Sequence, residues 1–192
     1  MVPIAMPLSS SPPVILVLAA GRGERFVASG GTVHKLQALL AGKTVIDHVL
    51  DAVKASGLPY HVVTADASRP GMGDSIAAGV QATPGAAAWL ILPADLPLIS
   101  PGTLRAIAFA APCAVTVPVY QGQRGHPVRF GFECASDLIK LQGNQGASQL
   151  IRAQTAINSI ALIAVDDAGC VTDIDTLDDL ARAEAMLIRR TG

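Results

Sequence analysis

Short apolar runs alternate with segments of helical periodicity along most of the chain. Residues 14–18 form a β-branched apolar run that stops at Ala-Ala-Gly, which predicts a buried strand leading into a loop. Apolar residues recur at helical spacing from residue 44 to residue 56, and Gly57 ends that pattern. Downstream, the pattern predicts strands at 60–64, 87–93, 114–120, 127–132 and 157–165, and helices at 74–81, 101–110, 136–141, 147–153 and 177–188.

This alternation predicts the class of fold. Strands separated by helices of about ten residues are typical of a mostly parallel sheet with helices on both faces. Only 15% of the residues are charged, which fits strands that are buried on both sides. We therefore predict an α/β protein with a Rossmann-like three-layer α/β/α fold. Residues 14–192 would form one domain, preceded by a flexible tail of residues 1–13 that is rich in proline and serine.

Composition excludes several classes of partner. The net charge of −1 offers no basic field for nucleic acid or for an anionic membrane surface. We find no apolar stretch of the ~18 residues that a membrane span needs. The three cysteines lie far apart, so we expect free thiols in the reducing cytoplasm rather than disulfides or a zinc site.

The loop after the first strand is the first candidate site, because ligands of such sheets bind where strands end. Gly21 and Gly23 allow a ligand to approach the backbone, and Arg22, Arg25 and Lys35 supply positive charge for phosphate groups. The dinucleotide-binding fingerprint is not complete, since Phe26 stands where its third glycine belongs. An ordinary glycine turn with solvated arginines explains the same residues equally well.

Two further loops carry carboxylates. Asp95 ends an apolar strand, where a charge is costly unless it meets a cation, and Mg²⁺ is usually held by one or two carboxylates plus phosphates. The alternative for Asp95 is a turn residue before Pro97. Asp173 and Asp175 lie on one side of an extended segment. For Asp175 a metal ligand and a helix-terminal role stay open, whereas for Asp173 we favour the structural role.

Smaller motifs complete the set of candidates. The glycine-rich turn at residues 68–75 leads into a helix, where Asp74 is a possible cap and Ser75 a possible contact for a base or sugar. Thr176 and Asp179 have the spacing of a capping box. His126 lies in a turn between two predicted strands, where a surface or packing role is the simpler interpretation.

Taken together, these motifs resemble the nucleotidyltransferases that include the molybdenum cofactor cytidylyl- and guanylyltransferases. The likeness covers about residues 14–187. It rests on five motifs in the same order: Leu18-Ala19-Ala20-Gly21-x-Gly23-x-Arg25 with Lys35-Leu36, Gly71-Met72-Gly73-Asp74-Ser75, Pro93-Ala94-Asp95-Leu96-Pro97, Gly125-His126-Pro127-Val128 and Asp173-Ile174-Asp175-Thr176-x-x-Asp179-Leu180. One departure is the later position of Lys35, because residues 26–34 lengthen the loop before it.

The resemblance implies roles for individual residues. Arg25, Lys35 and Asp95 would be catalytic, and Asp95 with Asp175 would hold Mg²⁺. Gly125, His126 and Pro127 would face the acceptor. The residues expected at the nucleotide are Leu18, Ala19, Ala20, Gly21, Arg22, Gly23, Gly71, Gly73 and Ser75. Ala-Ala-Gly goes with cytidine in this family, because the Ala20 methyl would occupy room that a purine needs.

The resemblance also implies a reaction. We expect Mg²⁺-dependent transfer of CMP from CTP to a phosphorylated acceptor, molybdopterin, with release of pyrophosphate. The product would pass to a molybdenum hydroxylase or its maturation chaperone. Alternatives are a GTP-using guanylyltransferase, a cytidylyl- or uridylyltransferase of a small sugar or alcohol phosphate, and a non-catalytic nucleotide- or cofactor-binding maturation factor.

Overall fold

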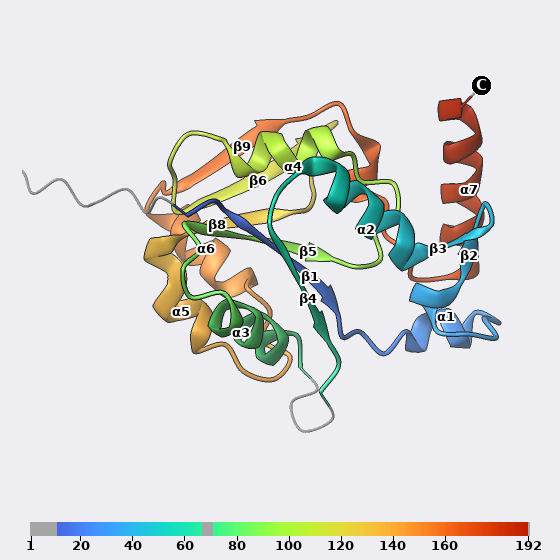
Figure 1. Ribbon diagram of the computed structural model, residues 1–192, viewed down its shortest axis with the longest axis horizontal. Coiled ribbons are helices and arrows are strands. Elements are labelled where there is room, and N and C mark those ends of the chain that lie inside the picture. The colour runs from blue at the N-terminus through green and yellow to red at the C-terminus, as the bar shows by residue number, and fades with distance from the viewer. Residues whose placement is uncertain (1–10, 67–70, 192) are drawn as a thin grey trace, which may run out of the picture.

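A twisted central sheet runs through the computed structural model, which describes residues 11–66 and 71–191 (Figure 1). Its strands lie in the order β4, β1, β5, β8, β6, and both β7 and β9 pair with β6. Their bounds are β1 (Val14–Ala19), β4 (Tyr60–Thr64), β5 (Ala88–Pro93), β6 (Val115–Tyr120), β7 (Gln123–Arg124), β8 (Val128–Gly131) and β9 (Ile160–Ala164). β1 is parallel to β4 and β5, and β6 is parallel to β9, whereas β8 is antiparallel to its neighbours. The prediction of a mostly parallel sheet is confirmed.

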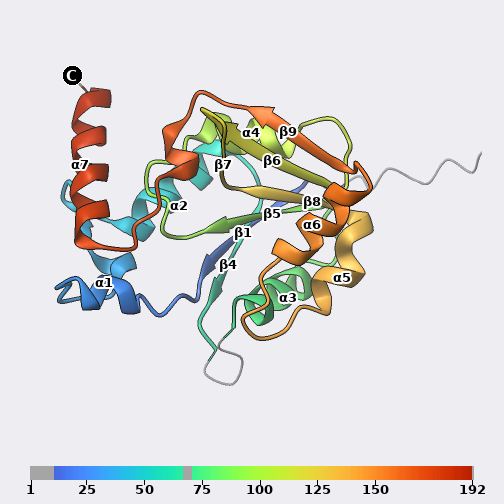
Figure 2. The ribbon, with the colours of Figure 1, turned by 180° about the vertical axis from the view of Figure 1, so that it is seen from behind.

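Helices cover both faces of this sheet, as the two opposite views show (Figures 1 and 2). One face carries α2 (Val45–Ser56) and α4 (Pro101–Ala108), and the other carries α3 (Met72–Ala82), α5 (Ala135–Ile139) and α6 (Ser148–Ala156). At one end of the molecule, α1 (Glu24–Ala28) and α7 (Leu177–Thr191) lie near a hairpin of β2 (Leu39–Leu40) and β3 (Lys43–Thr44). Three short 3₁₀ turns are η1 (Lys35–Gln37), η2 (Phe132–Cys134) and η3 (Ala168–Val171). Among the helices of the described ranges, none is both long and apolar enough to cross a membrane.

The core is divided by the sheet into two apolar clusters. Along β1, Ile15 and Val17 belong to the cluster under α2 and α4, whereas Leu16 belongs to the cluster under α3 and α5. All three are fully buried. Side chains of a strand alternate between the two faces, so a strand covered on both sides must be apolar throughout. This explains the continuous apolar runs and the low content of charge.

Short-range signals in the sequence correctly predicted where several helices begin or end. Ser100 caps α4 by accepting a hydrogen bond from the Thr103 N–H, and Gly57 ends α2 with a φ of 71°. The expected strand at 157–165 begins only at Ile160, because Asn158 takes a positive φ at the end of α6. The loop that follows β1 contains a short helix, α1, which buried Phe26 anchors. Residues 1–10 of the expected tail and residues 68–70 lie outside the described residues.

Candidate active site

A cleft of about 730 Å³ opens at the carboxyl ends of β1 and β5. β1 lies between β4 and β5, so the chain crosses to opposite sides of it, and ligands of open α/β sheets bind at such a reversal. The predicted site residues that line the cleft are Leu18, Ala20, Gly21, Arg22, Gly23, Arg25, Lys35, Gly71, Ser75, Asp95, Gly125, His126 and Asp175. Segments far apart in the sequence therefore converge at the expected edge of the sheet.

Three of the candidate residues do not line the cleft. Gly73 packs α3 against a neighbouring loop: its N–H donates to the Gly143 carbonyl over 2.8 Å, and a Cβ would lie 2.6 Å from the Gln145 carbonyl oxygen. Ala19 packs against the core cluster beneath α2 and α4. Pro127 is buried and follows a cis peptide bond with His126. These residues shape the walls behind the cleft.

The long loop after β1 is folded back on itself by a histidine. The Leu36 N–H donates to His34 Nδ1 over 3.3 Å, so the neutral ring carries its proton on Nε2 and donates to the Gly21 carbonyl over 2.8 Å. Gly23, with a φ of 66°, begins α1 within this loop. Because His34 ties the end of the loop to its start, the next residue, Lys35, points into the cleft despite the additional length.

Backbone hydrogen bonds bring the two candidate metal ligands together. The Ala94 N–H donates to the Leu18 carbonyl over 3.1 Å, which fixes the end of β5 beside β1. The Ile174 N–H then donates to the Asp95 carbonyl over 2.9 Å, and Ile174 itself is fully buried. Asp175 is the next residue, so its side chain is held next to that of Asp95.

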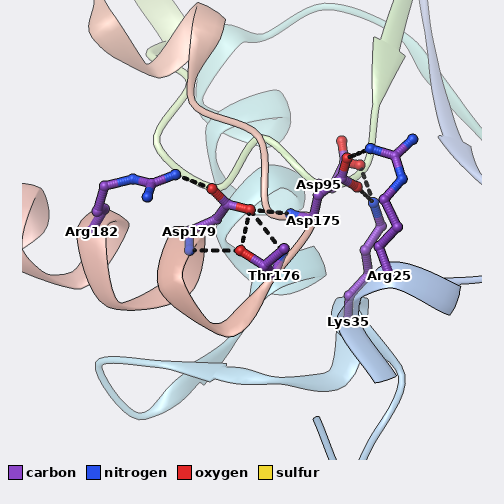
Figure 3. A network of polar contacts seen from close by, with 7 residues as sticks. All are labelled: Arg25, Lys35, Asp95, Asp175, Thr176, Asp179 and Arg182. Atoms are coloured by element: carbon purple, nitrogen blue, oxygen red, sulfur yellow. Dashed lines mark hydrogen bonds and ion pairs between the residues drawn. The ribbon is translucent and has the colours of Figure 1, made fainter. Parts of the chain in front are cut away.

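Lys35 bridges the two carboxylates. Its Nζ donates to Asp95 Oδ2 over 2.6 Å and to Asp175 Oδ1 over 2.7 Å, as Figure 3 shows. The Lys35 side chain is only 10% exposed, compared with 17% for Asp95 and 28% for Asp175. Arg25 adds an outer ion pair from its Nη1 to Asp175 Oδ2 over 2.5 Å, and its side chain is 80% exposed. Two cations and two carboxylates thus form one cluster.

The electrostatics of this cluster keep Lys35 charged. Burial by itself would lower the pKa of Lys35, but the charges of Asp95 and Asp175 and their hydrogen bonds outweigh it and raise that pKa above its ordinary value. An ammonium group placed between two carboxylates is the favourable arrangement for three partly buried charges.

The start of α7 orients Asp175 without using its side chain as a cap. The Asp179 N–H donates to Thr176 Oγ1, and Asp179 Oδ2 accepts from the N–H groups of Thr176 and Asp175. The predicted capping box is therefore confirmed. In Figure 3, Asp179 and Arg182 lie on the helix side while the Asp175 carboxylate faces Lys35 and Arg25. Helix capping thus falls to Asp179, leaving the Asp175 side chain in the cleft.

A loop at residues 142–146 closes the cleft beside the start of α3. Asp74 Oδ2 accepts from the Gly71 N–H over 3.2 Å and from the Gly143 N–H over 3.0 Å. Gly71 must lack a side chain, because a Cβ there would lie 2.0 Å from the Gly143 carbonyl oxygen. Ser75 Oγ donates to the Gly71 carbonyl, so its hydroxyl is engaged within the helix. Asp74 therefore caps the start of α3, as the sequence suggests, and also joins that helix to the loop at residues 142–146.

His126 lines the cleft just before β8. Its N–H donates to the Cys170 carbonyl over 2.8 Å, and a Cβ at the preceding Gly125 would lie 2.4 Å from that same oxygen. Burial lowers the pKa of His126, and the backbone of Ile91 and the charges of Asp95 and Asp173 offset this only in part. The imidazole is thus neutral at pH 7, and its Nδ1 has no hydrogen-bond partner in the described part of the chain.

The carboxylate pair suits a hard divalent cation. Asp95 Oδ1 is buried and has no hydrogen-bond partner within the described residues, so one carboxylate oxygen of the pair is left without a polar partner. Within residues 11–66 and 71–191, no three His, Cys, Asp or Glu side chains cluster as metal ligands. Mg²⁺ commonly uses one or two carboxylates and completes its octahedron with water and substrate phosphates. The donors present therefore fit a cation that is completed by a phosphate-bearing ligand.

Sequence reasoning missed two residues of this site. The first is His34, and its position directly before Lys35 was the available signal. Asn144 lines the cleft from the 142–146 loop, and its position between Gly143 and Gly146 was the corresponding signal there. Asp173, for which a structural role was favoured, is exposed at the wall of the cleft.

The fold and the cleft together define a class of protein. A glycine loop, basic side chains and carboxylates meet at the switch point of a three-layer α/β fold, which is the arrangement of an enzyme that handles nucleotide phosphates. The chain belongs to the family described as the MobA-like NTP transferase domain, whose model matches residues 15–158. It is therefore a nucleotidyltransferase.

Known proteins resemble the chain over most of its length. The purine catabolism protein PucB of Bacillus subtilis is 29% identical over an alignment of 188 positions, gaps included, which covers 84% of this chain and 91% of PucB. Among solved structures, Rv0371c of Mycobacterium tuberculosis is 25% identical with a TM-score of 0.74, covering 90% of this chain and 96% of the other. Rv0371c has also been crystallised in complex with manganese.

Two more distant structures share the fold. A nucleotidyl transferase from Methanothermobacter has a TM-score of 0.80 at 23% identity, with 93% of this chain and 99% of that one covered. Molybdopterin-guanine dinucleotide biosynthesis protein A from Archaeoglobus fulgidus has a TM-score of 0.62 at 19% identity, with 92% and 99% covered. The prediction of a nucleotidyltransferase-like α/β fold is thus confirmed.

Proposed function

We propose that this nucleotidyltransferase moves CMP from CTP to the phosphate of a molybdopterin acceptor and releases pyrophosphate. The observation that carries the proposal is the convergence of the Ala20–Gly21 loop with Lys35, Asp95 and Asp175 in one cleft. An open glycine backbone, basic side chains and a carboxylate pair are what a metal-bound triphosphate needs. Membership of the MobA-like family supports this choice of reaction.

Mg²⁺ is the divalent cation that we propose for Asp95 and Asp175. The free Asp95 Oδ1 and the pairing of two hard oxygen donors support it. The manganese complex of Rv0371c gives further support, because Mn²⁺ and Mg²⁺ favour the same oxygen ligands. When bound, the cation would supply positive charge to the α-phosphate and the departing oxygens.

The chain's own residues would do the remaining work of positioning and charge neutralisation. An oxygen of the acceptor phosphate attacks the α-phosphorus of CTP, forming a new P–O bond as the bond to pyrophosphate breaks. Arg22, Arg25 and Lys35 would stabilise the negative charge that the leaving pyrophosphate gains, together with the N–H groups of the glycine loop. This step requires no covalent intermediate with the enzyme and no base.

The nucleotide and the acceptor would occupy different parts of the cleft. Ala20 lines the cleft, and its methyl group would leave less room there for a purine than for cytosine. Gly125 and His126 line the cleft beside Cys170, and we assign that part of the cleft to the acceptor. The name of the Archaeoglobus protein refers to a molybdopterin dinucleotide, which supports the acceptor but points to guanine as the alternative base.

The cellular setting follows from this reaction. A molybdopterin dinucleotide would be delivered to a molybdenum hydroxylase or to its maturation chaperone, so we propose a transient protein partner of that kind. All three cysteines are free thiols, and Cys134 and Cys170 are buried, which supports a reducing, cytoplasmic location.

The direct test is pyrophosphate release with each of CTP, GTP, ATP and UTP, with and without molybdopterin. We expect acceptor-dependent release with CTP and Mg²⁺, and nearly complete loss of it in Asp95→Asn. Asp51→Asn is the matched control, because Asp51 is an exposed aspartate paired with Lys43 outside the cleft. Pyrophosphate release that does not depend on the acceptor, or full activity in Asp95→Asn, would contradict the proposal. A preference for GTP would overturn only the choice of nucleotide.

A further inference from the structure

The positive charge between the two cleft aspartates comes from the chain itself. Lys35 contacts one oxygen of each carboxylate, and Arg25 holds the second oxygen of Asp175. Of the four carboxylate oxygens, only Asp95 Oδ1 is a buried atom without a hydrogen-bond partner in the ranges that the structure describes. In the ligand-free protein, Lys35 and Arg25 therefore already balance the negative charge of the two aspartates that would bind a divalent cation.

We propose that Lys35 and Arg25 are exchangeable counter-ions: they hold Asp95 and Asp175 in place in the free enzyme and move to the nucleotide phosphates when a divalent cation binds. This inference rests on the proposed function, since it takes the two aspartates to be metal ligands. It assigns Lys35 a positioning role before the reaction that is separate from its contact with phosphate.

The charges support such an exchange. Two carboxylates are balanced equally well by a lysine with an arginine or by one divalent cation. If the divalent cation joined the cluster while both side chains stayed, three centres of positive charge would crowd two carboxylates in a partly buried cleft, which is unfavourable. Once released, Lys35 and Arg25 need new anionic partners, and the triphosphate of an incoming nucleotide supplies them.

The geometry provides a path for the exchange. Asp95 Oδ1 has no hydrogen-bond partner among the described residues but is buried, so a cation gains it as a ligand when the Lys35 side chain moves away from Oδ2. Arg25 is largely exposed, and its release from Asp175 costs little because exposed ion pairs are weak. Lys35 is nearly buried between both carboxylates, so its release is the costly step.

A coupling between metal and nucleotide follows. A divalent cation alone must leave Lys35 without an anionic partner, whereas a cation that arrives with a triphosphate gives Lys35 a new one. The enzyme should therefore bind the metal weakly without nucleotide and tightly with it, and by linkage each ligand should raise the affinity for the other.

The test measures binding of Mn²⁺ by electron paramagnetic resonance in Lys35→Met, with and without CTP. Methionine keeps the length and apolar stem of lysine while removing its charge. We expect Lys35→Met to bind Mn²⁺ without nucleotide on the order of tenfold more tightly than the wild type, and to lose most of the strengthening by CTP. Lys43→Met is the matched control, because it removes an exposed lysine–aspartate pair outside the cleft and should leave Mn²⁺ affinity unchanged.

Thermal unfolding keeps the test decisive if Lys35→Met is unstable. Loss of the bridging ammonium should lower the midpoint, and Mn²⁺ alone should restore it, whereas Mn²⁺ should not rescue Lys43→Met. Arg25 is exposed, so its replacement should leave the fold intact. Arg25→Met should tighten Mn²⁺ binding by a smaller factor than Lys35→Met does.

The outcomes separate the two proposals. Mn²⁺ affinity without nucleotide that is unchanged or weaker in both Lys35→Met and Arg25→Met would overturn the exchange while leaving the metal site itself in place. If neither the wild type nor any of the variants binds Mn²⁺, with or without CTP, the metal assignment in the proposed function fails together with the exchange.

Discussion

At the scale of single residues, the centre of the cleft is the Lys35 ammonium group, which lies between the carboxylates of Asp95 and Asp175. Asp95 could be predicted because a carboxylate at the end of an apolar strand needs a cation. The bridge from Lys35 to Asp95 and Asp175 could not, because it joins residues that are distant in the chain. Whether Lys35 reaches the cleft depends on the bond from His34 to Gly21, which no spacing rule predicts.

Ala20 is the residue on which the choice of base depends. Ala20 lines the cleft just after the end of β1. At the neighbouring Gly21, an added Cβ would meet no atom within 4 Å. We expect Ala20→Gly to raise the ratio of kcat/KM for GTP to that for CTP by about tenfold, because one methyl group in a close-fitting pocket has an effect of that order.

The matched control for this prediction is Ala19→Gly. Ala19 packs against the core rather than lining the cleft, so this variant adds the same backbone freedom without enlarging the pocket. The measurement is steady-state pyrophosphate release with the two nucleotides. If Ala20→Gly stays active and the ratio does not change, the steric explanation of base choice is wrong.

At the scale of elements, local signals predicted what local hydrogen bonds determine. The capping box of Thr176 and Asp179 and the Ser100 cap were readable from the sequence because their partners lie within one helical turn. The short elements α1, β2 and β3 were missed, since they are too brief to show periodicity. Their positions depend on tertiary contacts such as the one between the Ala41 N–H and Glu184 of α7.

The cap of α7 links stability to the position of Asp175. Burial would raise the pKa of Asp179, but hydrogen bonds from the Thr176 hydroxyl and the N–H groups of Asp175 and Thr176 lower it below the ordinary 3.8. We expect Asp179→Ala to reduce the free energy of unfolding by about 1 kcal/mol at pH 7. Its activity should also fall, because the backbone of Asp175 loses a partner.

The pH dependence has a definite sign. An aspartate with a lowered pKa stabilises the native state above its unfolded-state value, and this stabilisation is lost as the pH falls through the native-state value. Urea unfolding should therefore show the difference between wild type and Asp179→Ala at pH 5 and 7, and a smaller difference below about pH 3.8. Asp178→Ala, an exposed change in the same turn, is the control; a pH-independent difference would contradict the role of the carboxylate.

At the scale of the whole molecule, the alternation of strands and helices predicted the fold class but not the order of strands. β8 lies between β5 and β6 and runs antiparallel to both, although it follows β6 in the chain. Such an order reflects long-range pairing that composition and periodicity do not encode. The position of the cleft was nevertheless predictable, because the strand-end rule for α/β sheets depends on β1 and β5 alone.

The most direct test of the proposed reaction follows the α-phosphate of CTP. The enzyme would be incubated with Mg²⁺, molybdopterin and CTP labelled at the α-phosphate, and the products separated by chromatography. We predict that the label moves into an acceptor–CMP adduct, that the released pyrophosphate is unlabelled, and that Asp95→Asn forms no adduct. Label that remains in CTP, or that appears only as free CMP whether or not the acceptor is present, would contradict nucleotidyl transfer to this acceptor.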